Sequence, residues 1–321
     1  METKRCDFSG EDTDSLSTII YRVSTSVELM AGMSLNVFII AVNIADRLRN
    51  RGLKPVDQIL TALAVSRFFY LCLLMFKLLC MVLIPWVFEF TRLYQMFKAA
   101  TWFLTCTTLF FSATLCAFYC AKIANFQQRT FILLKTRISQ LVPYLLLFSV
   151  FASLVNTSPF FYGIYQVACS KQENDSHPSG NGTRLGSANL ETNTLNLFLF
   201  CSIGFSVAFS FLATLAFLLL FSLWQHTRTC SASFGRPNLE AHFRAVKIIL
   251  CLLTTEALKF VALILLLSNI FLDRSPQSRF CTSIALGCPT IESGIVIWGN
   301  PKLKEAFMAT VAHCSLPLPL K

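Results

Sequence analysis

The chain has 321 residues, of which 55% are hydrophobic and 14% carry a charge. A soluble domain normally contains about 25% charged residues, so the composition excludes an ordinary soluble multi-domain enzyme and favours a protein that crosses the membrane several times. The formal net charge is +10, but the basic residues are scattered in short loops between apolar runs. We therefore expect the basic residues to set the orientation in the membrane and to contact membrane lipids, and we do not expect the protein to bind nucleic acid.

The apolar runs predict an all-α membrane protein, a bundle of seven transmembrane helices. Residues 1–18 are polar and lack the basic and apolar regions of a cleavable signal, so we expect an extracellular N-terminal segment and a first span that acts as an uncleaved signal. Residues 19–300 form the helix bundle, and residues 301–321 form a short cytoplasmic tail. The expected spans are 21–44, 58–88, 99–121, 138–162, 194–224, 246–270 and 281–298.

The third span is the clearest of the seven. No residue between Lys98 and Lys122 carries a charge. A helix rises about 1.5 Å per residue, so this stretch is long enough to cross a hydrocarbon core of roughly 30 Å.

Basic residues and sequons predict the orientation. Most Lys and Arg residues outside the spans lie in the loops after spans one, three and five and in the tail, which indicates a cytoplasmic C-terminus and an extracellular N-terminus. The polar loop 166–193 contains two glycosylation sequons, at Asn174 and Asn181. Both fall on the side that this orientation makes extracellular, where N-glycosylation takes place.

Six ionisable residues lie within or at the edge of the spans. They are Glu28, Arg67, Lys77, Glu256, Lys259 and Glu292. A charge at the centre of a membrane helix costs about 2.5–3.5 kcal/mol on insertion scales, so we expect these side chains to face the bundle and to pair. Three acids and three bases permit complete pairing, and the spacing of Glu256 and Lys259 allows a pair along one helix face. The pairs either fix the helix register or line a ligand cavity or switch, and the sequence leaves both interpretations open.

The sequence contains none of the common catalytic or metal-binding motifs. There is no HExxH, no GxSxG, no glycine-rich phosphate loop and no Cys/His cluster with zinc spacing. Most of the 13 cysteines lie inside apolar runs, where they behave as small hydrophobic residues. We therefore expect that the protein is not an enzyme and that it binds neither a metal ion nor a cofactor.

Several short strings, in the right order and on the right spans, resemble the type 2 taste receptors, the bitter-taste branch of the seven-helix G-protein-coupled receptors. They are NVFI at 36–39, LAVSR at 63–67, FYCAKIANF at 118–126, LLLFSLWQH at 218–226, AHFRAVK at 241–247 and GNPKLK at 299–304. The resemblance covers about residues 28–306. The third span lacks both a DRY-like triad and a cysteine at its outer end, so the chain does not resemble the rhodopsin class.

The chain also departs from the family pattern. Ala208 stands where most members have a proline in mid span five, which predicts a straighter helix. The remaining departures replace family side chains in and around the expected pocket: Cys106 for an Asn, Glu256 and Lys259 for tyrosines, Thr282 for an acidic residue of some members, and Glu292 for the His that precedes Ser293. The resemblance therefore does not predict the agonists of this chain.

The resemblance implies a bitter taste receptor in the plasma membrane that binds bitter small molecules in its extracellular half. The residues expected to contact the agonist are Trp102, Thr105, Cys106, Glu256, Lys259 and Thr282. The implied partner is a heterotrimeric G protein with a gustducin-type or inhibitory α subunit, which leads to phospholipase C and calcium signalling. The residues expected to face this partner are Lys122, His226, His242, Arg244 and Lys247.

Two further hypotheses complete the prediction. Arg67 and Glu292 form an inter-helix pair between spans two and seven that acts as an activation switch, with Asn36 as a third member and Ser293 beside it. The competing class is a membrane transporter or channel. Such proteins often carry inverted repeats and short interrupted helices, and neither feature is evident in this sequence.

Overall fold

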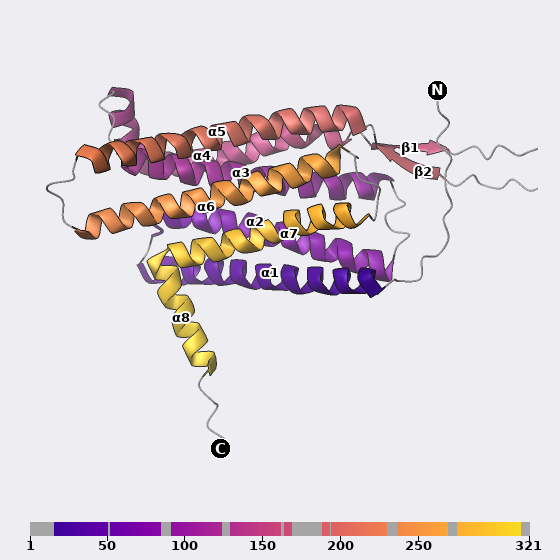
Figure 1. The fold of residues 1–321 in the computed structure, drawn as a ribbon, viewed down its shortest axis with the longest axis horizontal. Coiled ribbons are helices and arrows are strands. Elements are labelled where there is room, and N and C mark those ends of the chain that lie inside the picture. Colours follow the sequence, from indigo (N-terminus) through magenta and orange to yellow (C-terminus); the bar gives the residue numbers. More distant parts are fainter. Residues whose placement is uncertain are drawn as a thin grey trace, which may run out of the picture.

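The computed structural model describes residues 16–50, 52–84, 91–123, 129–161, 164–168, 188–192, 194–229, 236–268 and 275–315. Within these ranges, seven helices are long and apolar enough to cross a membrane. They lie side by side in an elongated bundle (Figure 1). They are α1 (Leu16–Asn50), α2 (Pro55–Leu83), α3 (Thr91–Ile123), α4 (Arg129–Thr157), α5 (Thr194–Thr229), α6 (Arg236–Leu267) and α7 (Pro276–Gly299). Each corresponds to one expected span, so the seven-helix prediction is confirmed.

Most of the helices extend beyond the apolar stretch that revealed them. For example, α3 begins at Thr91 rather than at residue 99, and α5 continues to Thr229 rather than to residue 224. A helix satisfies its own backbone hydrogen bonds, so it can continue with polar residues into the aqueous layer. Three helices end earlier than expected: α2 at Leu83 instead of residue 88, α4 at Thr157 instead of 162, and α6 at Leu267 instead of 270. The largest difference is in α2. Its next residue, Ile84, precedes a proline and has left the helical conformation (φ −144°, ψ 65°).

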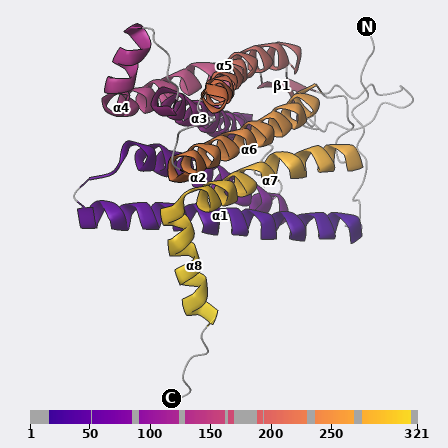
Figure 2. The ribbon, with the colours of Figure 1, turned by 60° about the vertical axis from the view of Figure 1, so that its left-hand side comes forward.

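An eighth helix, α8 (Pro301–Ser315), occupies the stretch predicted only as a tail. Pro301 is its first residue, where the missing N–H costs nothing, and the side chain of Asn300 accepts a hydrogen bond from the backbone N–H of Lys302 at 3.1 Å. In Figures 1 and 2 this helix runs across the bundle axis and away from α7. It therefore begins at one end of the bundle and does not lengthen it.

Two short strands, which were not predicted, accompany the helices. Strand β1 (Ile164–Ala168) pairs with β2 (Ala188–Thr192) in an antiparallel sheet, with Ile164 opposite Thr192 and Ala168 opposite Ala188. A 3₁₀ turn, η2 (Ser158–Phe161), follows α4. The strands lie at the end of the bundle opposite α8 (Figure 1). The sequons at Asn174 and Asn181, and most of the expected N-terminal segment, lie outside the described residues.

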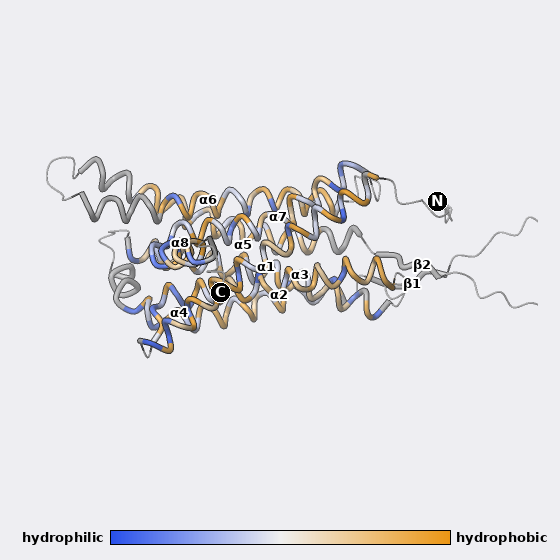
Figure 3. The backbone as a smooth tube through the Cα atoms, turned by 90° about the horizontal axis from the view of Figure 1, so that it is seen from below, coloured by the Kyte–Doolittle hydropathy of each residue, from blue (hydrophilic) through white to orange (hydrophobic). Residues whose placement is uncertain are grey.

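Helix α3 is the centre of the bundle and contacts α2, α4, α5 and α6. Of the most apolar 18-residue stretch of α3, 72% is buried inside the bundle, whereas the corresponding share is 22% in α4 and 28% in α5. Four of its buried hydroxyl groups are satisfied within the helix, because Thr105, Thr107, Thr108 and Thr114 each donate to a backbone carbonyl one turn earlier. Figure 3 shows the hydrophobic residues along the length of the bundle and hydrophilic residues gathered towards its ends and on α8.

Candidate functional site

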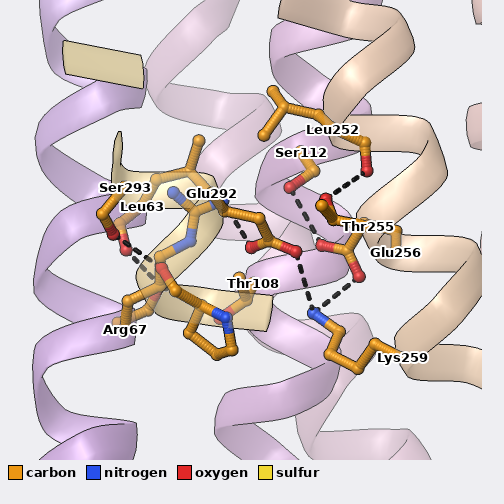
Figure 4. A network of polar contacts seen from close by, with 12 residues as sticks. Leu63, Arg67, Thr108, Ser112, Leu252, Thr255, Glu256, Lys259, Glu292 and Ser293 are labelled. Carbon is orange, nitrogen blue, oxygen red and sulfur yellow. Dashed lines mark hydrogen bonds and ion pairs between the residues drawn. The ribbon is translucent and has the colours of Figure 1, made fainter. Parts of the chain in front are cut away.

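Four buried charged side chains meet in the middle of the bundle, and we call them the ion network: Arg67, Glu256, Lys259 and Glu292. They come from α2, α6 and α7, and each is at most 2% exposed. Nη2 of Arg67 lies 2.8 Å from Oε2 of Glu292. Nζ of Lys259 lies 2.6 Å from Oε2 of Glu256 and 3.7 Å from Oε1 of Glu292. The predicted pairs Arg67–Glu292 and Glu256–Lys259 are thus both present and are joined through Glu292 (Figure 4).

The central helix also contacts the ion network. Oγ of Ser112 donates to Oε1 of Glu256 at 3.3 Å, which connects α3 to α6. Two positive and two negative groups make the network neutral. This balance matters because a buried charge without a partner costs far more than a paired one. The network therefore ties α2, α3, α6 and α7 together at one level of the bundle.

Asn36 reaches this region through a neighbour. The hydroxyl of Ser293 lies 2.9 Å from Oδ1 of Asn36 and 2.8 Å from the carbonyl of Pro289. The amide of Asn36 donates to the carbonyl of Gly32 at 2.8 Å. Asn36 therefore connects α1 to α7 beside the ion network, through Ser293 and with no hydrogen bond to Arg67 or Glu292 among the contacts of the described residues.

The expectation of complete pairing is wrong for the other two charges. Among the described residues, neither Glu28 nor Lys77 takes part in an ion pair. The carboxylate of Glu28 packs against Gly287 of α7, where an added Cβ would collide with it. Nζ of Lys77 lies 5.9 Å from the centre of the Phe97 ring, a cation–π contact between α2 and α3. Both side chains are only partly buried, unlike the four charges of the ion network.

An aromatic cluster lies between the ion network and the end of the bundle that carries the strands. It consists of Trp102, Phe160, Phe205, Phe209 and Phe260. The Trp102 ring centre is 5.6 Å from that of Phe160 and 6.1 Å from that of Phe205, and Phe260 stacks on Phe205 at 5.1 Å. The indole Nε1 of Trp102 is buried and has no hydrogen-bond partner among the residues that the structure describes. The cluster brings together α3, α5, α6 and η2.

The structure brings five of the six expected agonist contacts close together. Thr105 and Cys106 lie on α3 one turn from Trp102, and Cys106 is near enough to Lys259 and Glu256 to interact with them electrostatically. Tyr70 and Cys288 also surround Lys259, and the sequence reading missed both. Thr282 stands apart, because its hydroxyl donates to the carbonyl of Ser278 at 2.8 Å and its side chain interacts with Tyr21 of α1.

The residues expected to face a G protein lie at the end of the bundle opposite the strands. Lys122, at the end of α3, and Lys247, in the first half of α6, are both exposed. His226 belongs to α5, and His242 and Arg244 belong to α6, in stretches whose side chains are outside the described part of the structure. The backbone thus places all five at the same end of the bundle, where α3 and α5 end and α6 begins.

Sequence reading missed a second ionic group at that end, the Lys302 cluster, formed by Lys302, Asn43, Asp46 and Asp57. Nζ of Lys302 lies 2.7 Å from Oδ2 of Asp46, 3.2 Å from Oδ2 of Asp57 and 3.1 Å from Oδ1 of Asn43. Lys302 is the second residue of α8, and its partners lie on α1 and α2. The cluster therefore fixes the start of α8 against the first two helices. Only the separate positions of Asp46, Asp57 and Lys302 near span ends hinted at it.

The arrangement suits binding and conformational change. The described part of the chain holds no group of three or more His, Cys, Asp or Glu side chains that could bind a metal ion. A neutral set of charges shared by four helices can rearrange when the helices move. It has the geometry of an inter-helix switch beside an apolar, aromatic wall.

Comparison with known proteins identifies the family. The profile of the family described as taste receptor protein (TAS2R) matches residues 14–315. Taste receptor type 2 member 40 of Gallus gallus is 32% identical over 290 residues, which cover 89% of this chain and 92% of the relative. Taste receptor type 2 member 39 of Homo sapiens is 32% identical over 311 residues (95% and 90%), and member 9 of Macaca mulatta is 31% identical over 304 residues (90% and 92%). The chain therefore belongs to the TAS2R family of taste receptors.

Proposed function

We propose that this chain is a bitter taste receptor of the plasma membrane, which binds a bitter small molecule in its extracellular half and activates a heterotrimeric G protein of the gustducin or inhibitory type. Members of this family are multi-pass membrane receptors and not enzymes. The observation that carries the proposal is the neutral ion network across α2, α3, α6 and α7, directly next to the aromatic cluster.

The proposed orientation places the strands outside the cell and α8 in the cytoplasm. The excess of Lys and Arg at the α8 end supports it, and so does the position of both sequons between β1 and β2. Glycosylation of Asn174 and Asn181 belongs to the same proposal. Epitope tags on the two termini test it, because they must become accessible from opposite sides of the membrane.

Agonist binding is proposed at the boundary between the aromatic cluster and the ion network. The candidate contacts are Trp102, Thr105, Cys106, Glu256 and Lys259, with Thr282 further out. Concave sites of this kind are mostly apolar with a few polar groups that orient the ligand. The first five of these residues are all buried, three on α3 and two on α6, which supports a shared site.

The switch is proposed at Arg67 and Glu292. A ligand shifts the receptor only by as much as it binds the active arrangement better than the resting one, and each 1.4 kcal/mol of difference moves the equilibrium about tenfold. Glu292 contacts both Arg67 and Lys259. A ligand that displaces Lys259 therefore changes the electrostatic partners of Glu292, and thereby the contact between α7 and α2.

Movement of α3, α5 and α6 would open the cytoplasmic end to the G protein. Lys122, His226, His242, Arg244 and Lys247 lie on these three helices at that end. A bitter-compound screen tests the proposal by measuring calcium release in cells that co-express a gustducin-type G protein. Mock-transfected cells and cells without the G protein are the controls, and we expect responses only when receptor and G protein are both present.

The rival function, a transporter or channel, predicts a different result in the same cells. Ligand-driven uptake or current that persists without the G protein would support the rival and contradict the receptor. The membership of the TAS2R family argues against it. The screen also identifies the agonist, on which the sequence is silent.

A further inference from the structure

Lys259 is the outermost charge of the ion network on the side from which an agonist is proposed to arrive. It follows Glu256 by one turn on α6, in the direction of the aromatic cluster, and precedes Phe260 of that cluster. Its surroundings include Tyr70, Cys106 and Cys288. A ligand held against the aromatic cluster therefore meets the Lys259 ammonium before any other charge of the network.

The Lys259 ammonium has donor capacity to spare. An ammonium group carries three N–H donors, and a hydrogen bond requires a donor–acceptor distance of about 2.7–3.2 Å. Only Oε2 of Glu256, at 2.6 Å, lies close enough, whereas Oε1 of Glu292 is 3.7 Å away. Among the described residues, no other acceptor is bonded to this ammonium.

A second donor without a partner lies close by on α3. The Nε1–H of Trp102 is buried and unbonded, and the Trp102 side chain is 6% exposed. Trp102 is one turn from Cys106, which itself interacts with Lys259. The nearby hydroxyl group of Thr105 donates to the carbonyl of Thr101 at 2.9 Å and is therefore occupied. The Lys259 ammonium and the Trp102 indole thus both offer a donor at this boundary, and a buried donor without an acceptor is costly.

The charge of the ion network limits what can satisfy these donors. Arg67 and Lys259 already balance Glu256 and Glu292, so an anionic or cationic ligand would add an uncompensated buried charge. A neutral acceptor, such as a ketone, ester or lactone carbonyl, accepts from Lys259 or Trp102 without changing that balance.

We propose that this site selects uncharged aromatic molecules that carry a strong hydrogen-bond acceptor, with Lys259 and Trp102 as the donors and the aromatic cluster as the wall. This inference rests on the proposed receptor function and names the ligand class of the same site. Arylalkylamines, which are protonated at neutral pH, are disfavoured because the first charge that they meet is the Lys259 ammonium.

Four naphthalenes of matched size test the ligand class on the purified receptor in nanodiscs: 2-acetylnaphthalene, 2-ethylnaphthalene, 2-naphthoate and 1-(2-naphthyl)ethylamine at neutral pH. Binding is measured by saturation-transfer NMR with competition between pairs. We expect the ketone to bind about tenfold more tightly than the ethyl compound, since hydrogen bonds to charged groups are the stronger ones. We expect the carboxylate and the ammonium to bind more weakly than the ketone.

Two variants assign the donors. Trp102→Phe removes only the N–H and keeps an aromatic ring, and the double variant Lys259→Met/Glu256→Gln removes one charge of each sign so that the network stays neutral and folded. Each should reduce the preference for the ketone over the ethyl compound, and Lys259→Arg should retain it. Lys304→Gln on α8 is the matched control far from the site.

Several results would overturn the inference: equal binding of the ketone and the ethyl compound, tightest binding of the amine or the carboxylate, no binding of any of the four, or a ketone preference that both variants leave unchanged. The calcium assay separates this failure from failure of the proposed function. If the receptor signals in response to ligands that lack an acceptor group, the proposed receptor function stands and the proposed ligand class is wrong. If the protein binds the ketone with a selectivity that depends on the two donors but never signals, the ligand class stands and the proposed receptor function is wrong.

Discussion

The two ionic groups of this molecule are built from the same kinds of side chain but in different surroundings. In the ion network, Arg67 and Glu292 are 1% and 0% exposed, whereas in the Lys302 cluster Lys302 and Asp46 are 32% and 23% exposed. Charges in the first group have exchanged water for one another, whereas Lys302 and Asp46 in the second still share it and only Asp57 is buried. Loss of one partner is therefore severe in the ion network and mild in the Lys302 cluster.

The difference also assigns different tasks to the two groups. The ion network joins α2, α6 and α7 and reaches α3 through Ser112, so under the proposed function its charges bias the state of the receptor. The Lys302 cluster joins α8 to α1 and α2 and holds an element that lies outside the bundle. Three substitutions, ordered from the largest expected effect to the smallest, test this contrast.

The largest effect is expected from Arg67→Met. It leaves Glu292 buried with only the distant Lys259 as its partner, which should destabilise the folded receptor by about 3–5 kcal/mol. Thermal unfolding in detergent and cell-surface staining measure the loss. The double variant Arg67→Met/Glu292→Leu should recover most of it, because it removes both charges. If the single variant were as stable as the wild type, the desolvation argument would be wrong.

An intermediate effect is expected from Glu292→Gln. The amide keeps the shape of the side chain but removes the attraction to both Arg67 and Lys259, so the resting arrangement loses stability relative to the active one. A difference of about 1.4 kcal/mol would change basal signalling roughly tenfold. Calcium release without agonist, normalised to surface expression, is the readout. Basal activity and expression identical to the wild type would contradict the switch.

The smallest effect on stability is expected from Lys302→Met. The pair with Asp46 is partly exposed, and pairs of this kind contribute about 0–1 kcal/mol, so thermal unfolding should change less than in Arg67→Met even though buried Asp57 also loses its partner. The orientation of α8 should loosen, and we expect a lower maximal G-protein response with an unchanged half-maximal agonist concentration. Lys304→Met, two residues along α8, serves as the control. A collapse of folding in Lys302→Met would show that this cluster behaves like a buried one.

Much of the candidate site was predictable from individual residues. Arg67, Glu256, Lys259 and Glu292 are conspicuous because charges are rare in apolar spans, and their cost in lipid predicts pairing. The packing of the helices decides which acid pairs with which base. The spacing of residues in the sequence does not show that Glu292 contacts both Arg67 and Lys259. The same holds for Tyr70, Ser112 and Phe260, which have no unusual property in the sequence.

The sequence by itself determined the seven spans. A helix needs about 20 apolar residues to cross the hydrocarbon core, and in lipid it must satisfy its own backbone hydrogen bonds, so each span is visible as a local apolar run. It also determined the rare internal charges and the family to which the chain belongs. Only the tertiary structure decided that Glu28 and Lys77 stay out of the ion network, that α8 is held by Lys302, and that Trp102 retains an unbonded donor. These features depend on distances between helices far apart in the chain, which no local pattern records.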